Sequence, residues 1–465
     1  MDRVHAAPLQ IAPEALGSAE FLRDHGVRYA YVAGAMVKGI ASADLVVRMG
    51  RARLLSFYGS GGQFPDVVDA AIRKIRAGLP NGEPFGVNFL HNIQLPEVEV
   101  RTAEILFQHQ VRDIEAAAFI EFTPALVWYR LHGAHRTGDG IAIPNRILGK
   151  ASRTEVAERF LSAPPPQLVD ALERDGRITP DEAALAPFIP MCDDLCAEAD
   201  SAGHTDRRVA GILIPEFLHL RDRLMARERF AKRVRVGAAG GLGTPEAIAA
   251  AFIMGAEFVL TGSINQSTIE AGTSDCAKDL LAAAGTQDTD MTPASDMFEI
   301  GARVQVLKKG VLYPSRANKL YELYRRYNSL DEIDAATRRT IEEKYFRRTF
   351  EEVWKETSDY YARLAPGEIE KAERNPKQKM AMIFRWYLVH TSRLALAGSP
   401  EEKVHYQIHC GPAMGAFNQW VKGTPLEDWR NRHVDDIAVR LMHGAAELLE
   451  KRFAEFQSFQ EKAAP

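Results

Sequence analysis

The sequence predicts an α/β fold: a (β/α)8 TIM barrel with an inserted helical pair and a C-terminal α-helical substrate domain. Three observations support this prediction. A strand–turn–helix pattern repeats over residues 28–266, an interruption occurs at about residues 162–191, and helical patterns dominate after residue 302. The number of strands in the repeat decides between a closed barrel and a doubly wound open sheet, because both have the same local pattern.

Each expected strand is a short apolar, β-branched or small-residue run that ends in a glycine-rich or polar turn. Eight runs have this form: Tyr29–Ala35, Leu54–Tyr58, Phe85–Leu90, Ile114–Phe119, Arg146–Lys150, Leu195–Ala199, Val234–Ala238 and Phe258–Leu260. Helical patterns lie between most of them: Asp66–Ala77, Val98–His109, Thr154–Leu161, Pro215–Ala231 and Pro245–Met254. This alternation is typical of a parallel sheet, and a count of eight favours the barrel.

The interruption begins at Ala163-Pro164-Pro165-Pro166, and we expect it to be a helical pair between strands five and six, either a lid or decoration. After residue 302 the expected helices are Asn318–Tyr327, Asp331–Lys344, Phe350–Leu364, Pro376–Ala397, Pro412–Val421 and Val434–Gln460. Asn375-Pro376 and Ser399-Pro400 each place a capping residue before a proline at the first helical position. The sequence therefore predicts a barrel over residues 1–302 and a helical substrate or lid domain over residues 303–465.

Composition excludes several protein classes. The 465 residues are 46% hydrophobic and 26% charged, which excludes a disordered or fibrous chain. A net charge of −4 gives no reason to expect nucleic-acid binding. Four cysteines are too few for a disulfide scaffold, and Cys192 and Cys196 lack a second pair at zinc spacing, so no metal is expected. We see no secretion signal, and the longest apolar run, Ala247–Ala256, is too short for a bilayer, so we expect a soluble cytoplasmic protein.

The strongest local signal is a glycine-rich turn between an expected strand and an expected helix. Val236-Gly237-Ala238-Ala239-Gly240-Gly241-Leu242-Gly243-Thr244 leads into a helix at Pro245, and the next strand ends in Thr261-Gly262-Ser263. Small-residue turns after strands seven and eight form the usual phosphate site of a TIM barrel, where free N–H groups and the positive end of a helix face the anion. Tight turn chemistry alone is the alternative.

Further candidates lie at the ends of other expected strands. His204 lies in the loop Glu198–Asp206, where it can orient a ligand or exchange protons, or serve only a structural role. Asn88 can hydrogen-bond a planar heterocycle or cap a turn. Lys150 can stabilise an anion at the barrel mouth or lie on the surface. The small residues in Ala33-Gly34-Ala35-Met36 and Ser60-Gly61-Gly62 leave room for a flat ligand or form turns only.

Together these stretches resemble the FMN-dependent family of nitronate monooxygenases and FMN-type enoyl-acyl carrier protein reductases. The family's Gly-Gly-His loop reads Ser201-Ala202-Gly203-His204 here, with alanine in place of the first glycine, and its Ala-Gly-Gly loop reads Ala239-Gly240-Gly241. A closer resemblance, over nearly the whole chain, is to the PfaD-type trans-acting enoyl reductases of polyketide and polyunsaturated fatty acid synthases. It is carried by residues 39–42, 198–200, 203–206, 260–263, 293–297, 379–388 and 406–415.

The resemblance implies an FMN barrel with NADPH or NADH as the reductant, acting on enoyl chains that an acyl carrier protein holds. Hydride would pass from flavin N5 to the β-carbon and a proton to the α-carbon. The implied catalytic residues are His204, Lys150 and Asp206. The implied cofactor-binding residues are Ala33, Gly34, Met36, Gly61, Asn88, Lys150, Gly203, Gly240, Gly241, Thr261, Gly262 and Ser263. Gly240, Gly241, Gly262 and Ser263 would hold the phosphate, and Met36, Asn88 and Lys150 would surround the isoalloxazine. His204 would either donate the proton or position the thioester.

Two other functions stay open. A nitronate monooxygenase would use the same flavin, but a small substrate has no need of the helical domain. A non-catalytic scaffold that binds a phosphate ligand and docks on a synthase would not need the His204 loop or the lysine at position 150.

A basic cluster is the expected docking site for the carrier protein. Residues 303–327 hold seven basic residues and one acidic residue. The docking candidates are Lys308, Lys309, Arg316, Arg325 and Arg326. Carrier proteins are typically acidic, and complementary charge speeds association. A solvated helix face is the alternative, and a homodimer is one option for the oligomeric state.

Overall fold

The computed structural model describes residues 10–92, 96–138, 140–230 and 232–463. Eight parallel strands close into a barrel in the order β1-β10-β9-β8-β7-β4-β3-β2, which confirms the predicted TIM barrel. The barrel strands are β1 (Tyr31–Ala33), β2 (Leu55–Tyr58), β3 (Gly86–Leu90), β4 (Asp113–Ala117), β7 (Arg146–Ala151), β8 (Asp194–Glu198), β9 (Arg235–Ala239) and β10 (Val259–Thr261). Each overlaps one of the eight expected runs. Most of their residues are buried, as is typical of parallel strands covered on both faces.

Helices surround the barrel. They are α1 (Ala19–His25), α2 (Ala43–Arg51), α3 (Pro65–Gly78), α4 (Pro96–Gln108), α5 (Pro124–Leu131), α6 (Thr154–Phe160), α9 (Ala210–Arg227) and α10 (Pro245–Ile253). Thr123 and Thr244 cap α5 and α10 by accepting a hydrogen bond from the third helical N–H, and a proline follows each cap. The expected start of α9 at Pro215 was wrong, because the helix begins five residues earlier and accommodates the proline in its interior.

The interruption after β7 is helical, as expected. It contains α7 (Pro166–Arg174), α8 (Pro180–Leu185) and a 3-10 turn, Ala186–Phe188, and it precedes β8. Thr179 and Glu182 form a capping box at the start of α8. Two antiparallel hairpins were not expected: β5 (His135–Thr137) with β6 (Gly140–Ala142), and β11 (Thr289–Pro293) with β12 (Arg303–Leu307). Helical patterns were expected from residue 303, but Val304 and Val306 alternate in a strand and are buried.

The remaining chain is mainly helical. Its helices are α11 (Asp275–Ala282), α12 (Tyr313–Arg326), α13 (Ala335–Thr340), α14 (Phe350–Leu364), α15 (Pro366–Arg374), α16 (Pro376–Ala397), α17 (Ala413–Trp420) and α18 (Val434–Ala463). Asn375 caps α16 as expected, accepting from the N–H groups of Lys377 and Gln378. Ser399 makes no such bond. Among the described residues, none of these helices combines the length and apolar character needed to cross a bilayer.

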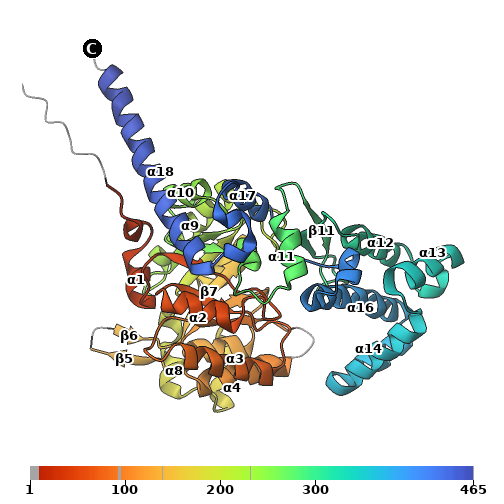
Figure 1. The fold of residues 1–465 in the computed structure, drawn as a ribbon. Coiled ribbons are helices and arrows are strands. Elements are labelled where there is room, and N and C mark those ends of the chain that lie inside the picture. Colours follow the sequence, from red (N-terminus) through yellow and green to blue (C-terminus); the bar gives the residue numbers. More distant parts are fainter. Residues whose placement is uncertain (1–9, 93–95, 139, 231, 464–465) are drawn as a thin grey trace, which may run out of the picture.

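Two apolar cores divide this region. One lies between α12, α14 and α16, with Phe350, Phe384 and Tyr387 at its centre, and Figure 1 shows these helices on one side of the barrel. Helices α17 and α18 instead join the core of the barrel through residues such as Phe417 and Leu441, and α18 lies against α10. The predicted domain boundary between residues 302 and 303 stays a prediction. Residues 413–449 lie beyond that boundary, but most of their buried side chains pack in the core of the barrel.

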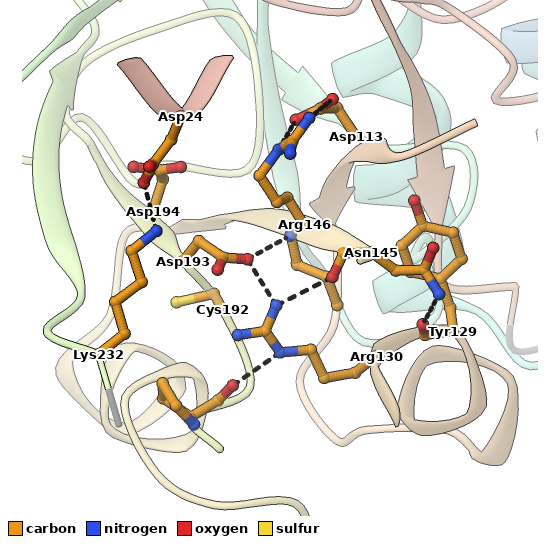
Figure 2. Close-up of polar contacts among 12 residues, drawn as sticks. Asp24, Asp113, Tyr129, Arg130, Asn145, Arg146, Cys192, Asp193, Asp194 and Lys232 are labelled. Carbon is orange, nitrogen blue, oxygen red and sulfur yellow. Dashed lines mark hydrogen bonds and ion pairs between the residues drawn. The ribbon is translucent and has the colours of Figure 1, made fainter. Parts of the chain in front are cut away.

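Charged residues close the barrel at the amino ends of its strands. The Arg146 guanidinium donates to both carboxylate oxygens of Asp113 at 2.7 and 2.6 Å, and both residues begin strands (Figure 2). Arg130 of α5 is fully buried and donates to Asp193 at 2.5 Å and to the carbonyl of Asn145 at 3.0 Å. This face is therefore held by paired charges, and the opposite face is left for a ligand.

Candidate active site

A cavity of about 1530 Å³ lies at the carboxyl ends of the barrel strands. It is lined by the loops that follow seven of the barrel strands, by Asn88 and Leu90 of β3 itself, by the connection between β11 and β12, by α14 and α16, and by the segment 407–413. The carboxyl ends of the strands are where TIM barrels bind their ligands. The barrel mouth and the helical region thus enclose one space.

The two predicted glycine turns lie side by side at this mouth, because β9 and β10 are paired neighbours. Gly240 (φ 86°) is required by packing, since a Cβ there would lie 2.4 Å from the carbonyl carbon of Ala199. Gly241 (φ 74°) and Gly262 differ, because a Cβ on either would meet nothing within 4 Å. Both line the cavity, at the start of α10 and after β10. Turn packing does not account for this open space, which suits the close approach of an anion to the backbone.

Ser263 completes this corner. Its hydroxyl accepts a hydrogen bond from the N–H of Gly411 at 3.0 Å, so its own proton can be donated to a ligand. The segment 407–413, between α16 and α17, is therefore anchored directly on the candidate phosphate site. Gln266 holds the same segment by donating to the carbonyl of His409 at 2.5 Å.

Lys150 lies in the cavity wall between two carboxylates. Its amino group is 3.0 Å from Glu198 and 3.4 Å from Glu115. Burial opposes the charge of Lys150, but the two carboxylates hold its pKa above the ordinary value. Glu115 also accepts from the N–H of Ala35 at 2.9 Å. Because two carboxylates already match this ammonium, its clearest role is to fix the wall beneath the ligand.

Asn88 lines the same wall and is buried. Its Nδ2 donates to the carbonyl of Glu115 at 3.0 Å, whereas its Oδ1 has no partner among the described residues. A buried acceptor without a donor is costly, so a ligand N–H at this point would remove a penalty. Met36, from the loop after β1, lines the cavity as well. The contact of Asn88 with a planar heterocycle stays a prediction.

His204 opens into the cavity from the loop after β8. Its Nε2 lies 3.3 Å from Oδ1 of Asp296, and the two side chains are 32% and 55% exposed. Burial lowers the pKa of His204, but the Asp296 carboxylate outweighs it and raises the pKa overall. Asp206, by contrast, lines the cavity but pairs with exposed Arg153 at 3.3 Å. The structure thus pairs His204 with the Asp296 carboxylate and pairs Asp206 with an exposed arginine.

The other predicted residues divide into two groups. Gly61, Gly203 and Thr261 line the cavity. Ala33 and Gly34 do not: Ala33 is buried within β1, and a Cβ on Gly34 would lie 2.5 Å from the Leu260 side chain.

The sequence-based site omitted Lys38, Glu115, Asp296 and His409, all of which line the cavity. Glu115 could have been found, because a carboxylate interrupts an otherwise apolar strand. Asp296 and His409 lie in segments noted only for their resemblance to a family.

The hairpin of β11 and β12 explains how distant segments meet. Gln305 of β12 donates to the carbonyl of Ala202 in the His204 loop at 3.4 Å. On the same strand, Val306 bridges to His409, and Leu307 donates to Ile408 at 2.9 Å. This strand therefore holds the His204 loop and the segment 407–413 in one arrangement.

Exposed apolar side chains form the cavity rim. Phe64, Ile120, Ile300 and Tyr360 are 56%, 50%, 72% and 42% exposed, and all four line the cavity. They come from four separate segments of the chain. Apolar groups gathered at a cavity mouth are typical of a binding site for an apolar ligand.

Comparisons with known proteins agree with this architecture. Residues 327–406 match the family model described as "[Acyl-carrier-protein] S-malonyltransferase, inserted helical domain". Polyketide biosynthesis protein PksE of Bacillus subtilis (strain 168) is 52% identical over 443 residues, which are 95% of this chain and 57% of that protein. A polyunsaturated fatty acid synthase protein of Thraustochytrium is 44% identical over 417 residues, 89% of this chain and 28% of that protein. The chain thus spans less than two thirds of these relatives.

Solved structures give a full-length match. The enoyl reductase domain of MlnA, from the macrolactin biosynthesis cluster of Bacillus amyloliquefaciens, is 42% identical with a TM-score of 0.91. The alignment covers 95% of this chain and 99% of that domain. FabK from Thermotoga maritima aligns over 94% of this chain and 99% of its own with a TM-score of 0.56, but at 17% identity it supports the fold alone.

Proposed function

Because this chain belongs to the PfaD-type family of enoyl reductases of polyketide and polyunsaturated fatty acid synthases, we propose that it reduces the α,β-double bond of enoyl thioesters carried by an acyl carrier protein. One observation supports this proposal above the others. The glycine turns, the His204 loop and the helical region open into one cavity with an apolar rim. Such a cavity has room for a cofactor and for an acyl chain that enters from the helical side.

The residues present fit FMN. The open space above Gly241 and Gly262 suits the phosphate, with the Ser263 hydroxyl as a further donor. The unpartnered Oδ1 of Asn88 suits a ring N–H, and Met36 lies in the same wall. FMN, when reduced by NADPH or NADH, would supply a hydride to the substrate.

The chain's own residues orient the substrate and handle the proton. Glu115, Lys150 and Glu198 keep the cavity wall fixed through paired charges. The segment 407–413 forms part of the cavity wall. His204 hydrogen-bonds to Asp296, and its protonated imidazole would donate the proton that the α-carbon accepts.

Mass spectrometry of a carrier protein tests this function directly. A carrier protein loaded with a 2-enoyl chain should gain the mass of two hydrogens when incubated with the yellow protein and NADPH or NADH. Steady-state oxidation of the nicotinamide should be faster with a 2-enoyl pantetheine thioester than without it, and a nitronate with oxygen should give no turnover. A colourless protein, or turnover of the nitronate alone, would contradict the proposal.

Replacing Gly241 with aspartate should give a folded protein that lacks flavin. The aspartate would fill the open space, its carboxylate would repel a phosphate, and φ 74° would strain any side chain there. The measurement is the visible flavin absorbance per chain after purification. Gly176→Asp is a matched control, because Gly176 also has a positive φ and open space but lies on the helical insertion. Full flavin occupancy in the Gly241 variant would contradict the phosphate placement.

The five basic residues proposed to bind a carrier protein differ in their contacts and exposure. Arg316 donates to His405 at 2.7 Å and its guanidinium lies over the Tyr345 ring, so it has a structural role. Lys308, Lys309, Arg325 and Arg326 are exposed. Lys309 is partly engaged, because it donates to the carbonyl of Ala283 at 2.7 Å. The exposed members remain the candidates for an acidic partner.

Reversing Lys308 and Lys309 to glutamate should raise the apparent KM for carrier-bound substrate about 10-fold, which is about 1.4 kcal/mol. Turnover of a pantetheine thioester without carrier protein should stay unchanged, because neither residue lines the cavity. Lys422→Glu with Lys451→Glu is the control, since both residues are exposed on other elements. An equal rise of KM for both substrates, or no rise for either, would mean that the basic cluster is a solvated surface with no role in docking.

A further inference from the structure

Lys38 places a partly buried cation in the cavity wall, in the loop after β1. Its backbone has φ 60°, a left-handed conformation that is uncommon for lysine. The N–H of Lys38 donates to the carbonyl of Gly61 at 2.7 Å, and that of the next residue, Gly39, donates to Gly59 at 2.9 Å. The loop after β2 therefore holds the strained turn in place. Strain of this kind is retained where a side chain must be held in one position.

The partners of this cation are unusual. Its Nζ donates to the Ser392 hydroxyl of α16, and no carboxylate of the described residues lies within ion-pair distance. Burial and, to a smaller extent, the charge of Arg393 lower the pKa of Lys38 to about 8, although the Asp296 carboxylate opposes them. Lys150, in contrast, has two carboxylates for one ammonium. Enclosing a cation without a counter-ion is costly, so an anionic oxygen from a ligand would be stabilised here.

The surroundings of Lys38 link it to His204. The charge of Asp296 acts on both residues, and its carboxylate bonds to the histidine. His409 also faces this corner, but burial and the charges of Lys38 and His204 lower its pKa to about 4. It is therefore neutral, and its Nε2 accepts from the Gln407 amide at 2.9 Å. Glu198 and Asp206 also act on His204, whereas Asp296 is the one carboxylate among the described residues whose charge acts on Lys38.

We propose that the Lys38 ammonium binds the carbonyl oxygen of the enoyl thioester and stabilises the negative charge that develops there, a role that rests on the proposed function. A bound flavin would supply the hydride that forms a C–H bond at the β-carbon. The π pair of the C=C bond would then form a new double bond between the α-carbon and the carbonyl carbon, and the π pair of the C=O bond would move onto the oxygen. Protonation of the adjacent α-carbon re-forms the carbonyl group. The oxygen and the α-carbon are separated by one carbon, so a cation and a proton donor are needed close together. Lys38 and His204 line the same cavity, and both act on Asp296 and His409.

Lys38→Met tests this role, because methionine keeps the length of the side chain and removes the charge. With a 2-butenoyl pantetheine thioester, which needs no carrier docking, kcat should fall about 100-fold while KM changes little. Lys38→Arg should regain about a tenth of the wild-type rate. Flavin content and the rate at which NADPH bleaches the flavin should not change, because neither involves the thioester. Lys451→Met, an exposed lysine of α18, is the matched control and should behave as wild type.

Labelling of the wild-type holoenzyme supplies a readout besides activity. An acetylating N-hydroxysuccinimide ester should modify Lys38, and the saturated butanoyl pantetheine thioester should protect Lys38 but not Lys451. If the wild type binds flavin but reduces no enoyl thioester, the proposed function fails, and protection still decides whether this lysine contacts a thioester. Loss of flavin in the Lys38→Met variant, turnover within twofold of wild type, or labelling of Lys38 that the thioester does not reduce would each overturn the proposal.

Discussion

Replacing His204 with alanine is expected to leave the protein yellow and to slow reduction of enoyl thioesters about 10²–10⁴-fold. The histidine lies on the loop after β8, whereas the candidate phosphate site lies after β9 and β10, so flavin binding should not depend on it. Asp296, 3.3 Å away, keeps the imidazole protonated to higher pH than usual, which provides a proton for the α-carbon. Steady-state oxidation of NADPH with a 2-enoyl pantetheine thioester is the measurement.

The Asp296→Asn variant separates a proton donor from a positioning group. Asp296 raises the pKa of His204, so its loss lowers that pKa. If protonated His204 is the active form, the rate of the variant should decline at a lower pH than that of the wild type as the pH rises. His219→Ala, an exposed histidine of α9, should have no effect. Near-wild-type turnover in His204→Ala would leave the histidine a structural role only.

The barrel was predictable because each of its strands can be recognised from a short run of consecutive residues. Each buried parallel strand appears as a short apolar run, and each is followed by a turn of small residues. The hairpin of β11 and β12 was missed for the opposite reason. The first of these strands, Thr289–Pro293, contains polar residues and a proline, and it is stabilised by pairing with residues 303–307 and by packing against α12. Pairing across an irregular connection leaves little trace in either segment alone.

The same distinction applies to the site. Gly241, Gly262 and His204 were predictable, because a glycine turn or a histidine at a strand end has meaning within a few residues. Lys38 and Asp296 were not, since their roles depend on loops that are 258 positions apart in the chain and meet only in the fold. The ion-pair partners of Lys150 could not be predicted from the residues around it in the sequence. It was expected to stabilise a ligand anion, and the two carboxylates that match it come from neighbouring strands.

A second large effect is expected at the closed face of the barrel. His25, the last residue of α1, is buried, and its two ring nitrogens contact Asp113 at 2.9 Å and Asp194 at 2.8 Å. Arg146 and Arg235 pair with the same two carboxylates. Figure 2 shows the Asp113–Arg146 pair, and it also labels Asp194 and Asp24, which both accept from Arg235. A doubly protonated imidazole can donate to both carboxylates at once, so this network joins α1 to β4 and β8.

The protonation of His25 follows from these partners. Burial alone would lower its pKa, but the charges and hydrogen bonds of Asp194 and Asp113 outweigh burial and raise the pKa to about 9. The unfolded chain has the ordinary value of about 6.5. Because the folded state keeps its proton to higher pH, the stabilisation is complete below about pH 6.5 and is lost as the pH rises towards about 9. The two aspartates have lowered pKa values, so their contribution is lost only in acid.

His25→Ala should therefore lower the free energy of unfolding by about 3–5 kcal/mol at pH 6, because it leaves two buried carboxylates without their shared donor. Urea denaturation at pH 6 and pH 9 measures this loss. The gap between variant and wild type should narrow at pH 9, where the histidine of the wild type begins to lose its proton. His135→Ala, an exposed histidine of β5, should change stability little at either pH. A gap of equal size at both pH values would mean that His25 stabilises the barrel by packing against Phe21, 4.5 Å away between ring centres, rather than by its charge.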